Sequence, residues 1–269
     1  MNCFEQARRV VIKIGSSTLT HKSGHINIRR MEQIVKILSD IRNSGKEIIL
    51  VSSGAIAVGV GKLGLPERPA DTPSKQAAAA VGQCELMYLY DKMFAEYNHN
   101  VSQVLMTRDI VENKQRKQNA ENAFDRLLTF HTIPIVNEND TVAVEEIEFG
   151  DNDTLSAVVA QLTQADVLVL MSDINGLYSG NPRTDSSARL IPRVDTIDSH
   201  IKAIAQGAGS SRGTGGMITK IHAAEIACGA GIDMAIINGE QPEQLYRLFD
   251  GEAVGTHFAA HPVKKEELP

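Results

Sequence analysis

Two lysines in this sequence stand where they could contact a phosphate group, and Lys13 is the first. It lies in the otherwise apolar run 10–14 and is followed by the small residues Gly15 and Ser16. Burying an unpaired ammonium group is costly, so Lys13 needs an anionic partner unless its strand is a sheet edge with the lysine in solvent. Backbone amides in a turn of small residues can help to hold an anion. We therefore interpret this segment as a candidate phosphate-binding turn.

The second lysine, Lys220, follows a glycine-rich segment at residues 213–219. That segment contains Thr214, Gly215, Gly216 and Met217. Glycines allow close main-chain contact, and the start of a helix presents amides and a positive partial charge to an anion. The glycine spacing differs from that of a Walker A sequence, so the segment predicts phosphate binding of another kind.

Carboxylates and amides concentrate in two further segments. One contains Asn137 and Asp140, and the other contains Asn152 and Asp153. Asn152 or Asp153 is also a candidate cap for a helix that begins near residue 154. Helix capping does not account for so many polar groups, and we interpret both segments as parts of a binding site.

A segment of small residues is a further candidate for ligand binding. Residues 48–51 are apolar and are followed closely by Ser53, Gly54 and Ala55. Small residues after a strand let a ligand approach the backbone, although a tight turn alone would also explain them.

These segments must be positioned by the elements between them, which alternate along the chain. Apolar runs predict strands at residues 10–14, 48–51, 101–106, 133–136, 167–171 and 234–237. Helical spacing or composition predicts helices at 28–45 with Asn27 as N-cap, 72–97 with Thr72 as cap and Gly82 as a candidate break, 119–130, 154–162, 215–228 and 243–249. Buried strands separated by helices predict one α/β domain over residues 1–269, an open, mainly parallel sheet with helices on both faces (an α/β/α sandwich). Ligands of such sheets bind outside the carboxyl ends of the strands, where the polar segments lie.

Composition excludes several other classes. The chain has 269 residues, a formal net charge of −6, 42% apolar residues, 4% aromatic residues and no Trp. A negative chain without a stacking platform is not expected to bind nucleic acid or acidic lipid. No apolar run approaches the roughly 18 residues of a membrane helix, and residues 1–6 lack a secretory signal pattern. Three isolated cysteines favour a reducing cytoplasm over a disulfide framework, and no paired His or Cys spacing predicts a metal site.

These segments, in this order, resemble the amino acid kinase family from about residue 8 to the end of the chain. The most specific parts of the likeness are residues 51–55, 137–140, 149–153 and 213–220. A tract at 172–178 with residues 181–183 is shared more widely across the family. Asn175 stands where the family usually has an acidic residue, a departure that leaves the reaction type untouched.

Within that family, the resemblance implies transfer of the γ-phosphoryl group of ATP to the side-chain carboxylate of L-glutamate, with Mg²⁺ bridging the ATP oxygens. This reaction is the first step of proline biosynthesis. The resemblance further implies inhibition by proline, a cytoplasmic homo-oligomer (dimer or tetramer), and a short form that lacks a C-terminal PUA domain. The amino-acid substrate then belongs to roughly residues 1–165 and the nucleotide to 166–269.

The implied chemistry brings two anions together. A glutamate side chain with a pKa of about 4.3 is ionised at pH 7, so no general base is required. Two unit charges about 4 Å apart repel by roughly 1 kcal/mol in water and roughly 4 kcal/mol at an effective dielectric constant of 20. Catalysis therefore depends on positioning and charge neutralisation. We expect Lys13 and Lys220 to neutralise the transferring group and Asp153 to hold both lysines.

The remaining roles follow from the same resemblance. Asp140 is expected to pair with the amino group of glutamate, Asn137 and Asn152 to add hydrogen bonds, and the segment Ser53, Gly54 and Ala55 to receive the α-carboxylate. The residues expected on ATP are Lys13, Gly15, Ser16, Ser172, Asp173, Thr214, Gly215, Gly216, Met217 and Lys220.

Three alternatives stay open at this point. The chain could be another carboxylate kinase, for aspartate or N-acetylglutamate, although Asp140 favours a substrate with a free amino group. It could be a nucleotide-binding regulator without turnover. The presence of all three expected catalytic residues, Lys13, Asp153 and Lys220, argues against this alternative. A dinucleotide-dependent oxidoreductase is disfavoured because the first strand is not followed by Gly-x-Gly-x-x-Gly.

Overall fold

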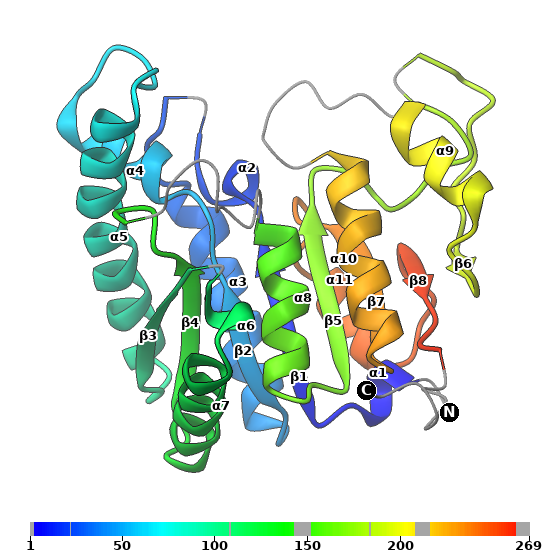
Figure 1. Ribbon diagram of the computed structural model, residues 1–269, viewed down its shortest axis with the longest axis horizontal. Coiled ribbons are helices and arrows are strands. Elements are labelled where there is room, and N and C mark those ends of the chain that lie inside the picture. The colour runs from blue at the N-terminus through cyan, green and yellow to red at the C-terminus, as the bar shows by residue number, and fades with distance from the viewer. Residues whose placement is uncertain are drawn as a thin grey trace.

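Strand β1 lies at the centre of an eight-stranded sheet, which we describe from a computed structural model (Figure 1). The structure describes residues 3–21, 23–107, 109–142, 152–182, 184–207 and 216–261. In these residues the strand order is β3-β4-β2-β1-β5-β7-β8-β6, and every pair is parallel except β7 with β8. The strands are β1 Arg9–Ile14, β2 Glu47–Val51, β3 Val101–Met106, β4 Ile133–Glu138, β5 Val167–Ser172, β6 Arg193–Val194, β7 Asp233–Asn238 and β8 Thr256–Phe258.

Helices cover both faces of this sheet. One core contains buried residues of α3, α5 and α11, and the other contains buried residues of α7, α8 and α10. Figure 1 shows α8 and α10 in front of the sheet and α3 and α11 behind it. The helices are α1 Cys3–Gln6, α2 Ser16–Leu19, α3 Ile28–Asn43, α4 Ala55–Leu63, α5 Thr72–Ala95, α6 Asp109–Glu112, α7 Lys114–Thr129, α8 Asn152–Leu162, α9 Ser199–Gly207, α10 Met217–Gly229 and α11 Gln244–Phe249. The expected α/β/α architecture is confirmed, and no helix in the described ranges is long and apolar enough to cross a bilayer.

The central position of β1 decides how Lys13 is placed. Lys13 pairs with Val51 of β2 on one side and Leu170 of β5 on the other. The reading of β1 as a sheet edge with a solvated lysine is therefore wrong. Because side chains alternate along a strand, Lys13 lies on the same face as Val11, which belongs to the core that contains α8 and α10.

Several predicted boundaries differ from the structure because capping residues shift the helix starts. Asp71, not Thr72, caps α5, since its side chain accepts a hydrogen bond from the Ser74 amide. Asn113 caps α7 at Lys114, earlier than the predicted start at residue 119. Helix α8 begins at Asn152, so Asn152 and Asp153 belong to its first turn. The cap at Asn27 is confirmed by its bond from the Arg30 amide.

Seven of the described elements were not predicted from the sequence, namely the helices α1, α2, α4, α6 and α9 and the strands β6 and β8. Strands β6 and β8 have two and three residues, too few to show a periodic pattern. They extend the sheet beyond β7 and close the second core with Phe258 and Val194.

Gly82 does not break α5, which runs without interruption from Thr72 to Ala95. It marks the place where α5 crosses α4 at close range. A β-carbon at Gly82 would lie 1.8 Å from the Ala55 carbonyl oxygen, and one at Gly59 would lie 1.8 Å from the Ala78 oxygen. These glycines let the backbones of α4 and α5 pack in direct contact. The contact at Gly82 positions the first residue of α4, Ala55, against α5.

We expect Gly82→Ala to destabilise the protein by about 1–3 kcal/mol, because the added methyl group overlaps backbone that cannot give way. Urea denaturation measures the difference in free energy of unfolding. The matched control is Gly229→Ala in α10, where an added β-carbon meets nothing within 4 Å. Equal stability of Gly82→Ala and the wild type would show that the helices do not depend on this approach.

Candidate active site

The carboxylate of Asp153 lies between two ammonium groups. Its Oδ1 is 2.6 Å from Lys13 Nζ, and its Oδ2 is 3.0 Å from Lys220 Nζ. The side chains of Lys13, Asp153 and Lys220 are 11%, 1% and 7% exposed. Two positive charges and one negative charge leave this lysine cluster (Lys13, Asp153 and Lys220) with a formal charge of +1, which suits it to receive an anion.

Three elements bring the lysine cluster together. Lys13 is the penultimate residue of β1, Asp153 lies in the first turn of α8, and Lys220 lies in the first turn of α10. The positive ends of two helix dipoles therefore meet beside it, which favours a negatively charged ligand. Thr219, which the sequence analysis did not single out, contributes a hydroxyl that donates to Asp153 Oδ2 at 2.9 Å.

Asp153 stays ionised despite its burial. Burial acts to raise its pKa, but the charges of Lys13 and Lys220 and their hydrogen bonds outweigh that effect. The pKa of Asp153 consequently lies well below its usual range. The carboxylate can hold both ammonium groups throughout the physiological pH range.

An amide network connects the ends of β2, β4 and the start of α8. Asn152 Nδ2 lies 2.8 Å from the Ser52 carbonyl oxygen, 2.8 Å from Ser53 Oγ and 2.9 Å from Asn137 Oδ1. Asn137, which is buried, in turn donates to Gln83 Oε1 at 2.9 Å. Three of the predicted substrate-binding residues are thus in direct contact.

Helix α5 supports this network with two residues that the sequence analysis missed, Gln83 and Tyr90. The hydroxyl of Tyr90 lies 3.0 Å from Ser52 Oγ, and burial raises the pKa of this tyrosine to about 12. The two residues are seven positions apart and therefore share one face of the helix. That seven-residue spacing could have indicated a shared polar face of the helix. The Ala-rich sequence around it, however, is typical of a helix-packing surface.

The turn after β2 lies against the turn after β1. Gly54 has φ of +94°, a left-handed conformation that favours glycine. A β-carbon at Gly54 would lie 3.7 Å from Ser16 Oγ, and one at Gly15 would lie 3.8 Å from Lys13 Nζ. The expected substrate segment (with Ala55 as first residue of α4) therefore adjoins the expected phosphate segment.

The predicted nucleotide residues that the structure describes lie beyond β5 and at the start of α10. Ser172 is the last residue of β5, and its hydroxyl lies 3.2 Å from Oδ1 of the exposed Asp173. Gly216 precedes Met217 at the start of α10 without a capping side chain, which leaves the first amides of the helix uncapped by a side chain. Thr214 and Gly215 lie outside the described residues.

Two further predicted positions can be located. Asp140 is half-buried in the turn after β4, two residues beyond Glu138. Asn175 accepts a hydrogen bond from Asn238 Nδ2 at 2.7 Å through its amide oxygen. A carboxylate oxygen would accept the same bond, so Asn175 makes a contact that an acidic residue at this position could also make.

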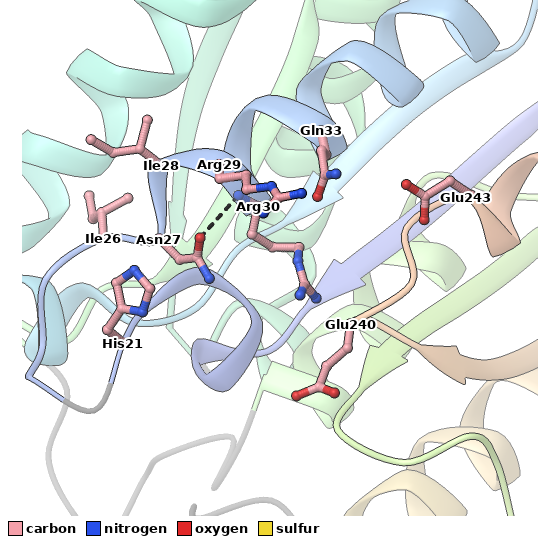
Figure 2. A pocket seen from close by; sticks show the side chains of 9 residues that line it. All are labelled: His21, Ile26, Asn27, Ile28, Arg29, Arg30, Gln33, Glu240 and Glu243. Carbon is pink, nitrogen blue, oxygen red and sulfur yellow. Dashed lines mark hydrogen bonds between the residues drawn. The ribbon is translucent and has the colours of Figure 1, made fainter.

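A cavity of about 640 Å³ lies between the start of α3 and the segment that follows β7 (Figure 2). Its lining includes Arg29, Arg30, Glu240 and Glu243 and none of the predicted site residues. Arg30 Nη1 donates to the Gly239 carbonyl oxygen at 2.7 Å, which links the two walls. The candidate active site is the lysine cluster with the adjoining amide network, not this cavity.

Residues 8–238 match the model of the amino acid kinase family. The chain belongs to the amino acid kinase family. Curated relatives named glutamate 5-kinase are 55% identical over 255 residues in Clostridium acetobutylicum and 51% identical over 261 residues in Clostridium perfringens. These alignments cover 95% and 96% of this chain and 96% and 97% of the relatives. A relative of the same name from Carboxydothermus hydrogenoformans is 53% identical over 98% of this chain, which spans 70% of that longer protein.

Solved structures share the fold at much lower identity. Carbamate kinase from Giardia lamblia bound to AMP-PNP superposes with a TM-score of 0.67 at 13% identity, covering 95% of this chain and 99% of that one. Isopentenyl phosphate kinase from T. acidophilum gives 0.63 at 18% identity, covering 93% and 99%. These matches confirm the expected fold.

We expect Asp153→Asn to reduce the free energy of unfolding by about 3–5 kcal/mol at pH 7, since two buried ammonium groups lose their counter-charge. The pKa of Asp153 is lower in the folded chain than the unfolded value of about 3.9. Its contribution is therefore complete above that value and is lost as the pH falls below it. Urea denaturation from pH 7 to about pH 3 should show the difference between variant and wild type shrinking.

The matched control for this titration is Asp195→Asn, because the Asp195 side chain is 73% exposed and pairs only with the exposed Arg193 among the described ion pairs. It should change stability little at any pH. A penalty for Asp153→Asn that is the same at both ends of the pH range would contradict the assignment of Asp153 as an ionised counter-charge.

Proposed function

We propose that the protein transfers the γ-phosphoryl group of ATP to the side-chain carboxylate of L-glutamate and forms L-glutamyl 5-phosphate, the first step of proline biosynthesis. The observation that carries the proposal is the pair of buried lysines on one carboxylate at the carboxyl edge of the sheet. Identity of 50–55% to glutamate 5-kinases over nearly the whole chain supports the choice of substrate.

The lysine cluster addresses the main obstacle of this reaction, the repulsion between its two anions. A side-chain oxygen of glutamate attacks the γ-phosphorus, the new O–P bond forms, and the bond to the β-phosphate oxygen breaks to release ADP. Lys13 and Lys220 offset the negative charge of the transferring group, while Asp153 keeps their ammonium groups in place. Electrostatic groups positioned in advance need no reorganisation during the reaction.

The amide network and the β2–α4 turn are proposed to bind the amino acid. Asp140 pairs with the α-amino group, and Asn137 and Asn152 donate or accept hydrogen bonds. The amides at Ser53, Gly54 and Ala55 receive the α-carboxylate at the start of α4. Proline also carries an α-carboxylate and a positively charged α-nitrogen, a secondary ammonium, so these residues are also the proposed place of proline inhibition.

The nucleotide is proposed to lie over β5 and α10, in the half formed by residues 166–269, and the amino acid over residues 1–165. Gly15, Ser16, Ser172, Asp173 and the segment Thr214–Met217 hold the phosphates and the nucleoside. Both oxygens of Asp153 contact ammonium groups, so Mg²⁺ would be held chiefly by ATP oxygens and water, with Asp173, which directly follows β5, as the candidate protein carboxylate. When bound, Mg²⁺ neutralises phosphate charge.

We also propose a dimeric or tetrameric assembly.

The reaction is tested by measuring ADP release and hydroxamate formation with L-glutamate, L-aspartate and N-acetyl-L-glutamate. We expect kcat/KM for glutamate to exceed that of the other two by at least about 100-fold, because Asp140 selects a free amino group and the network fixes the chain length. Added proline should reduce the rate with glutamate. Equal rates with N-acetyl-L-glutamate, or ATP binding without glutamate-dependent ADP release, would overturn the proposal.

Lys13→Ala and Lys220→Ala should each lower kcat by about 100-fold or more, since each removes a charge from the transferring group. Steady-state kinetics and circular dichroism check activity and fold together. Lys36→Ala is the matched control, because Lys36 is an exposed residue of α3. Near-normal turnover in either cluster variant would refute the two-lysine mechanism.

A further inference from the structure

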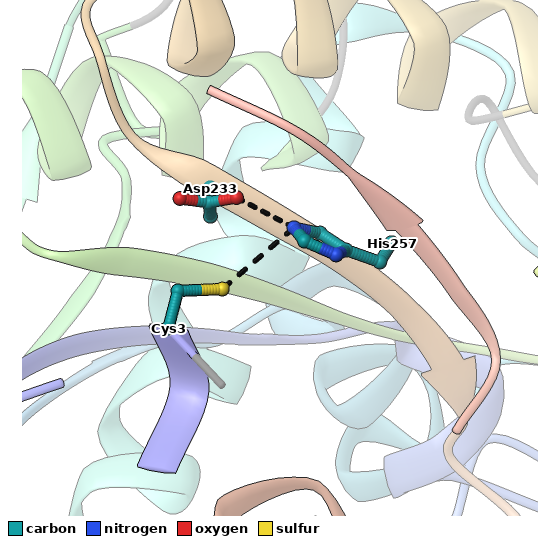
Figure 3. A group of neighbouring side chains, drawn as sticks. All are labelled: Cys3, Asp233 and His257. Carbon is teal, nitrogen blue, oxygen red and sulfur yellow. Dashed lines mark hydrogen bonds and ion pairs between the residues drawn. The ribbon is translucent and has the colours of Figure 1, made fainter. Parts of the chain in front are cut away.

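A thiol, a carboxylate and an imidazole converge at the end of the sheet opposite the lysine cluster (Figure 3). Cys3 belongs to α1, Asp233 is the first residue of β7, and His257 is the central residue of β8. Strand β7 is parallel to its neighbour β5, so its first residue lies far from the carboxyl edge used by the active site. We propose that these three residues form a binding site for a divalent transition metal, with Zn²⁺ as the preferred ion.

The geometry of the three ligand atoms supports a common metal position. Cys3 Sγ is 3.7 Å from His257 Nε2, Asp233 Oδ1 is 2.5 Å from the same nitrogen, and all three atoms lie within 4.8 Å of one another. Tetrahedral bonds of about 2.0–2.3 Å to Zn²⁺ separate neighbouring ligand atoms by about 3.4 Å. Small shifts of the side chains would therefore bring all three to bonding distance.

The same arrangement argues against a catalytic cysteine. In a nucleophilic triad the nucleophile and the carboxylate contact different nitrogens of the histidine. Here Cys3 and Asp233 both contact Nε2 of His257 (Figure 3). Such a ring does not relay a proton between them, whereas convergence on one nitrogen is what three ligands of one ion require.

The donor set matches the chemistry of zinc. Thiolate, imidazole and carboxylate are its usual protein ligands, and three of them leave a fourth position for water. Cys3 would bind as a thiolate and release its thiol proton to solvent, and the thiolate and the carboxylate together neutralise the charge of a divalent ion. The side chains of His257 and Asp233 are 18% and 22% exposed, so an ion can enter from solvent. The Ala260 amide donates to Asp233 Oδ1 at 3.3 Å and helps to orient it.

Without a metal, the contact with Arg193 indicates which ring nitrogen of His257 carries the proton. Its Nη1 lies 3.2 Å from His257 Nδ1. A guanidinium group can only donate, so Nδ1 accepts and the ring proton resides on Nε2, where it faces Asp233. Metal binding at Nε2 moves that proton to Nδ1 and displaces Arg193. Arg193 can move away from His257 because its side chain is 54% exposed to solvent. Its Nε can keep its ion pair with Asp195 when the contact with His257 is lost.

A bound ion would attach α1 to β7 and β8. In the described structure α1 has four residues, with Phe4 buried and its ring edge-on to His257 at 5.1 Å. The added bonds should stabilise the fold without any effect on phosphoryl transfer at the other end of the sheet.

The test is equilibrium dialysis of the tag-free chain against Zn²⁺ without nucleotide, followed by visible and near-ultraviolet spectroscopy with Co²⁺ as the probe ion. We expect the wild type to bind one Zn²⁺ at the site and Co²⁺ to give a thiolate charge-transfer band. Cys3→Ser should abolish the band, and Cys3→Ser and His257→Gln should each weaken Zn²⁺ binding by at least about tenfold. Cys84→Ser, at an exposed cysteine of α5, is the matched control and should behave as the wild type.

Arg193→Gln provides a second, independent arm. Removing the competitor for His257 should tighten Zn²⁺ binding, and it should not do so when His257 is also Gln. Equal Zn²⁺ binding by the wild type and Cys3→Ser, or a Co²⁺ spectrum without a thiolate band, would overturn the site. Because glutamate phosphorylation is measured separately, failure of the metal site leaves the proposed function unaffected.

Discussion

The ion pairs of Asp153 are the interaction on which the active site depends. Two ammonium groups cannot lie next to each other in a protein interior unless a counter-charge holds them, because burial and mutual repulsion both oppose it. Asp153 provides that counter-charge from the first turn of α8, with one oxygen for each lysine. The central position of β1 then matters, since Lys13 has a paired strand on each side and lies on the sheet face that α8 and α10 cover.

The same sheet edge brings the residues proposed to bind the amino acid next to those proposed to bind phosphate. Parallel strands end at one edge, so the turns after β1, β2 and β4 are neighbours although they are far apart in the sequence. The close approach at Gly82 sets the start of α4, and the left-handed Gly54 places the β2 turn beside Ser16. The proposed catalytic lysines and the proposed substrate-binding residues thus share one scaffold of strand ends and helix starts.

Much of this arrangement could be predicted from residue patterns. The apolar runs predicted six strands, and the polar residues that follow them indicated the candidate binding edge of the sheet. Supporting residues such as Gln83 and Tyr90 could not be recognised, because their role depends on which side of α5 faces the strands. Cys3, Asp233 and His257 gave no signal, since Cys3 lies more than 200 positions from the other two residues and paired His or Cys spacing was absent. Short strands such as β8 depend on tertiary pairing and are too short to show an alternating pattern of apolar and polar residues.

The most direct measurement is a crystal structure of the protein with glutamate and a non-hydrolysable ATP analogue. We expect Nζ of Lys13 and Nζ of Lys220 both to lie within about 3.2 Å of oxygens on the terminal phosphate while Asp153 still contacts both lysines. A terminal phosphate that neither lysine touches, or that only one reaches while the other stays on Asp153 alone, would contradict it.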